Sequence, residues 1–448
     1  MKTKQRPITT TGGREATTRH IPGDFALAVG MPSTAAPAGW TWTQLTDIAR
    51  LESGHTPSRK HPEYWDGDIP WICLTDARPN HGKVIEDTEE HTNDLGIANS
   101  SARVLPKDTV CLSRTASVGY VVVMGCEMAT SQDFVNWVCS KDLDHRFLKY
   151  LLIAENGAFR RFSSGAVHQT IYFPEVKAFH ICHPPLAEQR RIVGILDEAF
   201  EGLATAKANA QQNLQNARAL FESHLQSVFT QRGKGWVVKP LSELCDIKHG
   251  FAFKSEFFTS EGDYVLLTPG NFYESGGYRD RGEKQKYYIG EIPRDYVLSE
   301  GDLLVAMTEQ AAGLLGSSVL IPESDKFLHN QRLGLITKKP GVPWANEFFF
   351  HVFNTQAVRK EIHDSASGVK VRHTSPTKIG EVAVSFPTSL AEQRTIVATL
   401  ENLREETQRL NFLYQRKLAA LDELKKTLLH RAFTGALQQG ACQSVECN

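Results

Sequence analysis

One eleven-residue stretch occurs twice in this chain, 204 residues apart. Residues 186–196 read LAEQRRIVGIL and residues 390–400 read LAEQRTIVATL, with eight of the eleven positions identical. This spacing is too long for a solenoid, whose repeats span about 20–50 residues. The repeat therefore indicates a domain-sized unit that was copied once.

Other echoes follow in the same order along the chain. Residues 39–58 begin Gly-Trp, as do residues 235–255, and each run has a helical Leu-x-x-Ile/Leu spacing that ends in a glycine turn. LPKDTVCLSRTASVG (105–119) matches LSEGDLLVAMTEQAAG (298–313), and SGAVHQTI (164–171) matches SGVKVRHTS (367–375). Collinear echoes at a nearly constant offset predict two copies of one mixed α/β module, each followed by a long helix.

Within the modules, YVVVM (120–124) and DLLVAM (302–307) have the β-branched, apolar composition of strands. Residues 146–162 have the spacing of one helix. The fold class predicted is α+β, with two similar mixed α/β domains separated by two long helices. The domain boundaries expected are a mostly disordered lead (1–38), a first domain (39–185), a central helix (186–234), a second domain (235–388), a C-terminal helix (389–437) and a tail (438–448).

The two long helices carry matching apolar seams. Alternate steps of three and four residues from Val193 to Val228 meet nine apolar residues in eleven, and the same steps from Ile396 to Arg431 meet eight in eleven. A seam kept over five heptads predicts that the helices pair as an antiparallel coiled coil. The alternative is two separate amphipathic helices, one on each domain.

Composition limits the class of protein. No run approaches the ~18 apolar residues of a membrane span. Eight scattered cysteines without a C-x-x-C pair indicate reduced thiols, and hence a cytoplasmic protein without a zinc site. The net charge is −1, and residues 39–185 hold 14 Lys and Arg against 18 Asp and Glu, so the overall field does not attract nucleic acid.

Catalytic motifs are missing from the sequence. There is no phosphate-binding G-x-x-x-x-G-K-[ST] loop, no G-x-S-x-G elbow and no H-E-x-x-H. The Asn/Asp-Pro-Pro-aromatic tetrad of amino-methyltransferases is also lacking. A non-catalytic chain is expected, although an enzyme with its own recognition domains and a protein-only coiled-coil adaptor are kept as alternatives.

Three loops in each copy concentrate side chains that bond phosphates and base edges. Solvation alone would explain any one of these polar residues, but the same three places are polar in both copies. In the first copy the candidates are Arg59, Lys60, Ser113, Arg114, Thr115, Gln132, His168, Gln169 and Thr170. In the second copy they are Lys254, Thr308, Gln310, Gln331, Arg332, Lys370, Arg372 and His373.

The combined motifs resemble the specificity subunit of type I restriction–modification systems. They are the Gly-Trp start, GHTPSRKHPEYWDGDIPW (54–71), S-G-x-x-x-x-T and P-P-L-x-E-Q-x-x-I, and they cover about residues 39–435. The second copy departs from the pattern, with GFAFKSEFF for the TPS-x-x-x-PEYW stretch and PTSLAEQ for PPLAEQ. The departures leave open which bases are read.

The resemblance implies a DNA-recognition subunit that binds a bipartite asymmetric site in double-stranded DNA, one half to each domain. It also implies that two methyltransferase subunits dock on the helices and that restriction subunits join through them. S-adenosylmethionine, ATP and magnesium would belong to those partners, and this chain would hold no cofactor. The candidate partner-binding residues begin the two helices: Glu188, Gln189, Arg190, Glu392, Gln393 and Arg394. An ordinary role as polar helix-start residues is the alternative for these six.

Overall fold

The computed structural model describes residues 14–165, 169–231, 233–309 and 313–437. They form two compact units, one of Met1–Asn209 with Lys417–Asn448 and the other of Ala210–Arg416. The expectations for residues 1–13 and for the tail 438–448 lie outside the described residues.

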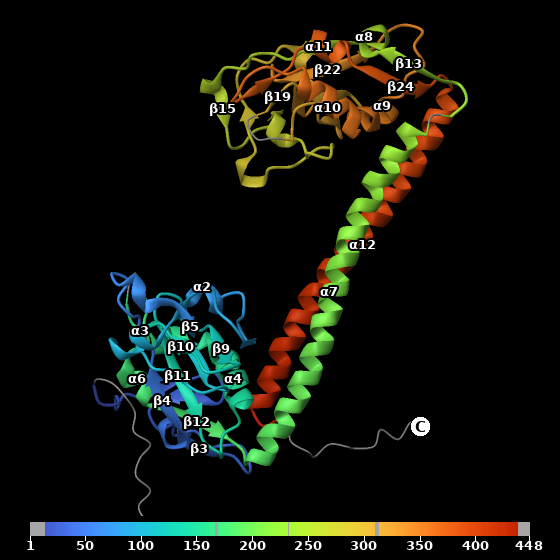
Figure 1. Ribbon diagram of the computed structural model, residues 1–448. Coiled ribbons are helices and arrows are strands. Elements are labelled where there is room, and N and C mark those ends of the chain that lie inside the picture. The colour runs from blue at the N-terminus through green and yellow to red at the C-terminus, as the bar shows by residue number, and fades with distance from the viewer. Residues whose placement is uncertain (1–13, 166–168, 232, 310–312, 438–448) are drawn as a thin grey trace, which may run out of the picture. The chain divides into compact units, whose positions relative to one another are not determined.

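The first unit is built on a five-stranded sheet in which β11 pairs antiparallel with both β4 and β8. Trp137 of β11 stands opposite Leu51 and Val110 and is fully buried. Helix α4 (His145–Ala154) packs against β8 and β9 (Figure 1). The order of the sheet is β4 (Ala49–Ser53), β11 (Phe134–Cys139), β8 (Val110–Ser113), β9 (Val121–Met124) and β6 (Val84–Ile85).

Two smaller sheets flank it. One has the order β10 (Ala129–Thr130), β5 (Trp65–Ile72) and β7 (His91–Thr92), and the other has the order β1 (Ile21–Pro22), β2 (Leu27–Val29), β12 (Phe179–His183) and β3 (Thr41–Gln44). The short helices are α1 (Leu45–Ile48), η1 (Pro62–Tyr64), α2 (Leu74–Ala77), α3 (Asp94–Ala98), η2 (Glu155–Gly157), α5 (Phe159–Phe162) and α6 (Phe173–Lys177). The single helix expected over 146–162 is therefore two α-helices, α4 and α5, joined by the short helix η2.

The prediction of a disordered lead is wrong for residues 21–29. Strands β1 and β2 extend the β12–β3 sheet, and residues 26–29 are buried. The buried carboxylate of Glu155 accepts hydrogen bonds of 2.6–3.1 Å from the four backbone N–H groups of residues 24–27. The polar composition of the lead concealed the apolar run FALAV (25–29), which is ordered because β12 offers it a free edge.

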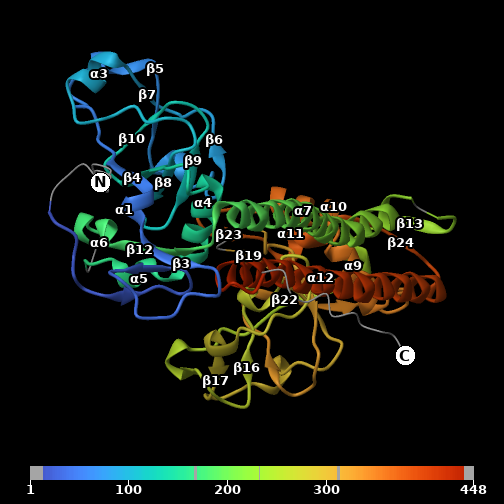
Figure 2. The same ribbon diagram turned by 90° about the horizontal axis from the view of Figure 1, so that it is seen from below.

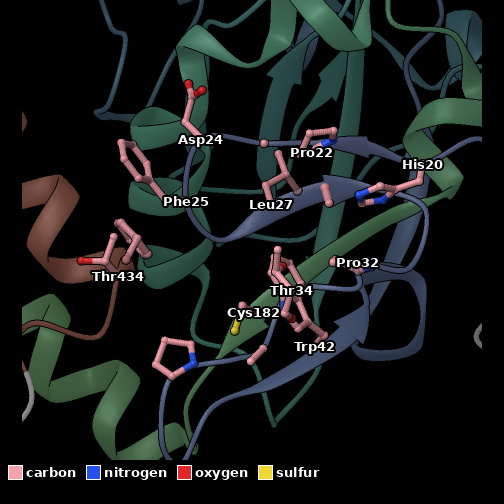
Figure 3. Close-up of a pocket in the computed structure, with 15 residues that line it drawn as sticks. His20, Pro22, Asp24, Phe25, Leu27, Pro32, Thr34, Trp42, Cys182 and Thr434 are labelled. Atoms are coloured by element: carbon pink, nitrogen blue, oxygen red, sulfur yellow. The ribbon is translucent and has the colours of Figure 1, made fainter.

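A hollow of about 260 Å³ lies beneath this segment. Figure 3 shows its lining, which comes from residues 20–37, from Trp42 of β3, from Cys182 of β12 and from the end of the C-terminal helix at Thr434. Among the described candidate DNA-binding residues, none lines this hollow.

The second unit repeats the plan. Strand β22 pairs antiparallel with β14 and β18, and Ile336 stands opposite Ile247 and Leu303. The sheet that contains β22 has the order β14 (Cys245–His249), β22 (Leu333–Lys338), β18 (Leu303–Ala306), β20 (Ser318–Leu320). A second sheet has the order β15 (Phe258–Thr259), β17 (Tyr287–Tyr288), β16 (Val265–Leu266), β21 (Phe327–Leu328). Two further sheets are strand pairs, β13 (Trp236–Pro240) with β24 (Ala383–Pro387) and β19 (Thr308–Glu309) with β23 (Arg372–His373). Its short helices are α8 (Leu241–Leu244), η3 (Ser255–Phe257), η4 (Pro269–Asn271), η5 (Gly282–Lys284), η6 (Arg294–Tyr296), α9 (Asn346–Phe353), α10 (Gln356–Asp364) and α11 (Pro376–Gly380).

Both copies begin with the same strand–turn–strand element. It is β3-α1-β4 in the first unit and β13-α8-β14 in the second, where α1 and α8 are single helical turns. The longer helical spacing read at Leu45 and Leu241 was misleading, because both leucines are buried from one turn while the following residues join the central sheet. The strands expected at 120–124 and 302–307 are confirmed as β9 and β18.

The long helices are α7 (Leu186–Thr230) and α12 (Leu390–Phe433). In the first unit Leu196 of α7 lies in one core cluster with Leu429 and Phe433 of α12, and Lys207 pairs with Asp422 at 2.7 Å. In the second unit the end of α7 and the start of α12 pack on one cluster, so in each unit a half of α7 lies beside a half of α12 (Figures 1 and 2). Within the described residues no helix is long and apolar enough to cross a membrane.

Burial follows the seam along α7 but leaves it on α12. All eleven seam positions of α7 are buried or half-buried. On α12, Lys417, Leu424 and Arg431 are exposed, and the buried face there passes through Leu418 and Ala432 instead. A helix of 3.6 residues per turn drifts about 20° per heptad from a strict 3.5-residue repeat, so the three-and-four pattern fails near the end of a long helix.

Candidate nucleic-acid interface

The three candidate loops of the first unit meet at one place. The Arg114 amide donates to the Asp133 carbonyl at 2.7 Å, and the Ile171 amide donates to the Arg114 carbonyl at 2.9 Å. An isolated bridge also joins Thr115 to Thr170. Residues 113–117, 131–133, 164–165 and 169–170 therefore form one surface, although 46 residues lie between the first and the last of these loops.

A glycine places the 54–60 loop against this surface, and the second unit uses the same device. A Cβ on Gly54 would lie 1.9 Å from the Ser131 carbonyl oxygen, and a Cβ on Gly250 would lie 2.2 Å from the Asn330 carbonyl oxygen. Only glycine permits so close a backbone contact. The two glycines stand 196 residues apart and hold equivalent loops together.

Arg59 is already engaged within the protein. Its guanidinium makes two 2.6 Å contacts with Glu90 and lies 3.8 Å from the centre of the Trp65 ring. The hydrogen bonds to Glu90 raise the pKa of Arg59 above its ordinary value. A DNA contact by this side chain would have to compete with that ion pair.

Arg114 is half-buried. Its Nη2 donates to the Gln132 carbonyl at 3.2 Å, and its guanidinium lies 4.7 Å from the centre of the Phe173 ring. Burial lowers the pKa of Arg114. The side chain of Gln132 is exposed and accepts a hydrogen bond from Thr56 Oγ1.

The remaining first-copy candidates divide by exposure. Lys60 and Gln169 are exposed and Thr115 is half-buried, whereas His168 lies outside the described residues. Ser113 and Thr170 are buried. The prediction that they bind DNA is corrected for these two: Ser113 Oγ donates to the Ser117 carbonyl at 2.5 Å and accepts from the Tyr120 amide at 2.8 Å, so it shapes the loop from inside.

Several candidates of the second unit line a hollow of about 640 Å³. Its lining includes four predicted residues, Thr308, Gln331, Arg332 and His373. Gln331, Arg332 and His373 are exposed, but Thr308 is buried, and its Oγ1 lies 3.2 Å from His373 Nδ1. Thr308 thus positions His373, and a DNA contact by Thr308 itself stays a prediction.

Buried polar groups hold the turn that carries Gln331 and Arg332. His329 is fully buried and bonds the Leu333 carbonyl at 2.9 Å, and burial lowers its pKa to about 4, which keeps the ring neutral. Asn330 Oδ1 accepts from the Arg332 amide at 3.0 Å. The turn is further fixed by the Gln331 amide, which donates to the Phe251 carbonyl at 3.0 Å.

The other described second-copy candidates do not line this hollow. Lys254 and Lys370 are exposed. Arg372 is half-buried, with its Nη1 3.0 Å from His363 Nε2 and its Nη2 2.8 Å from the His363 carbonyl. Gln310 lies outside the described residues.

The repeated glutamine of LAEQR makes the same contacts in both copies. Gln189 Oε1 accepts from the Asp144 amide at 2.9 Å, and its Nε2 donates to the carbonyls of Asp142 and Pro184 at 3.1 and 3.0 Å. Asp144 is the residue that caps α4. The glutamine therefore joins the start of α7 to the start of α4.

Gln393 repeats this geometry in the second unit. Its Oε1 accepts from the amide of Ala345, the residue before α9, at 3.0 Å, and its Nε2 donates to the carbonyls of Pro343 and Pro387, both at 2.9 Å. Both glutamines are fully buried, so the prediction that they bind a partner subunit is wrong. Their identity is required because one amide side chain can accept once and donate twice.

The neighbouring charged residues differ between the copies. Glu188 pairs with Arg191 at 2.7 Å, which lowers the pKa of Glu188, whereas Glu392 accepts from Trp236 Nε1 at 2.9 Å. Arg190 and Arg394 are both exposed. A partner-binding role stays a prediction for these four residues.

Comparison with family models matches residues 37–215 and, separately, residues 233–415 to the type I restriction modification DNA specificity domain. The chain belongs to this family. The two matched regions are called here the first and the second specificity domain.

Solved structures and curated proteins agree with this assignment. A structure from a study of complex assembly and conformational transition of the type I R-M system has a TM-score of 0.69 and is 18% identical, over 90% of this chain and 100% of its own. The HsdS subunit from Thermoanaerobacter tengcongensis has a TM-score of 0.59 and is 18% identical, over 90% and 99%. The MjaIX specificity subunit of Methanocaldococcus jannaschii is 26% identical over 231 residues, 48% of this chain and 53% of that protein. The chain spans about half the length of the curated relatives it matches.

The structure adds residues to the surfaces of both specificity domains that the sequence did not single out. Arg78 reaches the first-domain loops, with its Nη2 3.1 Å from Ser117 Oγ. His249 and Thr374 line the second-domain hollow. His249 directly precedes Gly250, so a comparison of residues flanking the two loop glycines would have found it.

Proposed function

We propose that this chain is the DNA sequence-specificity subunit of a type I restriction–modification complex, with each specificity domain reading one half of a bipartite, asymmetric site. The observation that supports this most is that each domain gathers exposed Gln and Arg side chains on loops held by the same glycine contact. Glutamine pairs well with adenine edges and arginine with guanine edges. Two related but different surfaces on one chain suit two different half-sites.

The chain itself is proposed to be non-catalytic, to act in the cytoplasm, and to scaffold the catalytic subunits. Two methyltransferase subunits would dock at the long helices α7 and α12, which we propose pair as an antiparallel coiled coil, and restriction subunits would join through them. The exposed Arg190 and Arg394 occupy equivalent places in the two copies, as two identical partners require. S-adenosylmethionine, ATP and magnesium would be bound by those partners.

The test is a titration of one labelled duplex, at fixed salt, by the chain alone and by the chain with its methyltransferase subunits. With a net charge of −1 the chain alone should bind weakly, and the complex should bind tightly and methylate one bipartite motif. Equal affinities in the two series would contradict the scaffold. A complex that preferred no DNA sequence would favour a protein-only adaptor.

A further inference from the structure

A second, smaller hollow lies beside the candidate base-reading residues Gln331, Arg332 and His373 of the second specificity domain. Its volume is about 380 Å³. It shares Thr308 and Arg332 with the larger hollow that Gln331 and His373 line, so the two hollows adjoin. The full lining is Thr268, Pro269, Gly270, Arg281, Lys286, Thr308, Leu314 and Arg332.

The charge of this lining is of one sign. It contains the cations Arg281, Lys286 and Arg332 and no carboxylate. Among the residues that the structure describes, none of the three is within 4.0 Å of a carboxylate oxygen, although surface cations elsewhere in the domain, such as Lys326 and Lys360, have such partners. A concave surface lined by one sign of charge concentrates the opposite charge from solution.

Arg281 and Lys286 line only this hollow, and their backbone is hydrogen-bonded to a buried pair of amide side chains. Asn271 Nδ2 donates to Gln285 Oε1 at 2.8 Å, and both side chains are buried. Asn271 Oδ1 accepts from the Thr268 amide at 3.0 Å, and Gln285 Nε2 donates to the Lys286 carbonyl at 3.2 Å. Gln285 Oε1 also accepts from the Arg281 amide at 3.4 Å.

This internal network fixes the backbone on either side of the hollow. A buried polar network stabilises one conformation when all its members are satisfied, and it is costly otherwise. The Arg281 guanidinium lies beside Gly270 across the hollow, and Lys286 Nζ lies 5.6 Å from the Phe258 ring. The chain therefore presents the positive side chains of Arg281 and Lys286 from one fixed loop, and that of Arg332 from the turn that also carries Gln331.

We propose that this hollow binds the backbone phosphates of the DNA strand whose bases lie against Gln331, Arg332 and His373. The proposal rests on the proposed function and adds a site to it. Phosphate contacts fix the register of a protein on DNA without reading sequence, and Arg and Lys are their usual donors. Arg281 and Lys286 would thus bind the phosphates of the strand, and Arg332 would lie between these two residues and the base-reading residues.

The experiment uses the full chain in complex with its methyltransferase subunits and measures duplex affinity over a range of salt concentrations. Each phosphate contact contributes about 0.9 to the slope of log affinity against log salt. The double variant Arg281→Ala, Lys286→Ala should lower that slope by about 1.8 and leave the methylated motif unchanged. Lys286→Met, which keeps an apolar stem beside Phe258, should lower it by about 0.9.

The matched control is Arg279→Ala, Lys284→Ala, which removes the same charge from exposed positions of the same loop that do not line the hollow. Its slope should stay at the wild-type value. The phosphate site would be overturned if the two double variants had equal slopes, or if the Arg281→Ala, Lys286→Ala variant had the wild-type slope. In either case, methylation of one bipartite motif by the wild-type complex would leave the proposed function intact. A wild-type complex without sequence preference would instead overturn the proposed function.

One further arm separates DNA from a small anion. Inorganic phosphate, at constant ionic strength, should raise the thermal unfolding midpoint of the wild-type complex by no more than it raises that of the Arg281→Ala, Lys286→Ala variant. A hollow-dependent rise with phosphate, together with unchanged DNA slopes, would assign the site to a small phosphate compound and overturn the proposal.

Discussion

The two specificity domains carry opposite charge at one equivalent segment. Residues 84–90 (VIEDTEE), which precede β7 in the first domain, hold four carboxylates and no cation. Residues 279–286 (RDRGEKQK), which precede β17 in the second, hold four cations and two carboxylates. The segments are equivalent because β5 pairs with β7 and β10 as β16 pairs with β17 and β21.

The support beneath these segments is alike in form and different in chemistry. Asp76 completes a capping box with Cys73 at the start of α2 and accepts from the Glu89 amide at 3.0 Å. Asn271 completes the equivalent capping box with Thr268 at the start of η4 and donates to Gln285. A buried side chain at the same position therefore organises each loop. The duplicated fold keeps its internal contacts while its exposed charges diverge, which fits the proposal that the two domains read different half-sites.

The largest expected effect concerns what the domains share. Gln189→Ala and Gln393→Ala should each destabilise their own unit by about 2–4 kcal/mol, because three backbone groups lose their partner and the buried side chain leaves a cavity. Amide hydrogen exchange at Asp144 and Ala345, with denaturant unfolding, measures this. The exposed controls Arg190→Ala and Arg394→Ala should change stability by no more than about 0.5 kcal/mol. If the Gln393→Ala variant were as stable as its control, the contacts of Gln189 and Gln393 would not be equivalent.

A smaller effect should separate the domains. Gln132→Ala should relax base preference in one half of the methylated motif and Gln331→Ala in the other, each by about 1–3 kcal/mol of discrimination. The measurement is the methylated motif of each variant, determined base by base. Gln212→Ala, on the exposed face of α7, is the control and should alter neither half. If one variant degraded both halves alike, that glutamine would be a structural or phosphate-binding residue.

The smallest effect should come from the acidic segment. Glu86→Gln with Glu89→Gln removes two exposed charges and should tighten duplex binding by the complex by about twofold at low salt, with little change above about 0.15 M, where exposed charges are screened. Glu198→Gln with Glu201→Gln, two exposed positions of α7, is the matched control. Weaker binding by the Glu86 and Glu89 variant would mean that these carboxylates support the loop or accept hydrogen bonds from DNA bases.

Much of the architecture was determined by sequence patterns that are local or repeated. The copied LAEQR stretch predicted two modules, and each long helix begins at the leucine of its copy, since helical periodicity and the preceding proline are encoded in neighbouring residues. The sequence identified the three polar loops of the first domain as candidates, and the structure brings them together through Arg114 and Thr170.

The role of each side chain depends on its neighbours in the folded chain. Ser113 and Gln132 are both polar loop residues, yet one is buried and the other exposed, because exposure depends on which strands pass behind the loop. The pairing of Arg59 with Glu90 and the enclosure of Gln189 by the start of α4 join residues more than 30 positions apart. Burial and hydrogen bonding are properties of such distant neighbours, and a pattern of nearby residues carries no record of them.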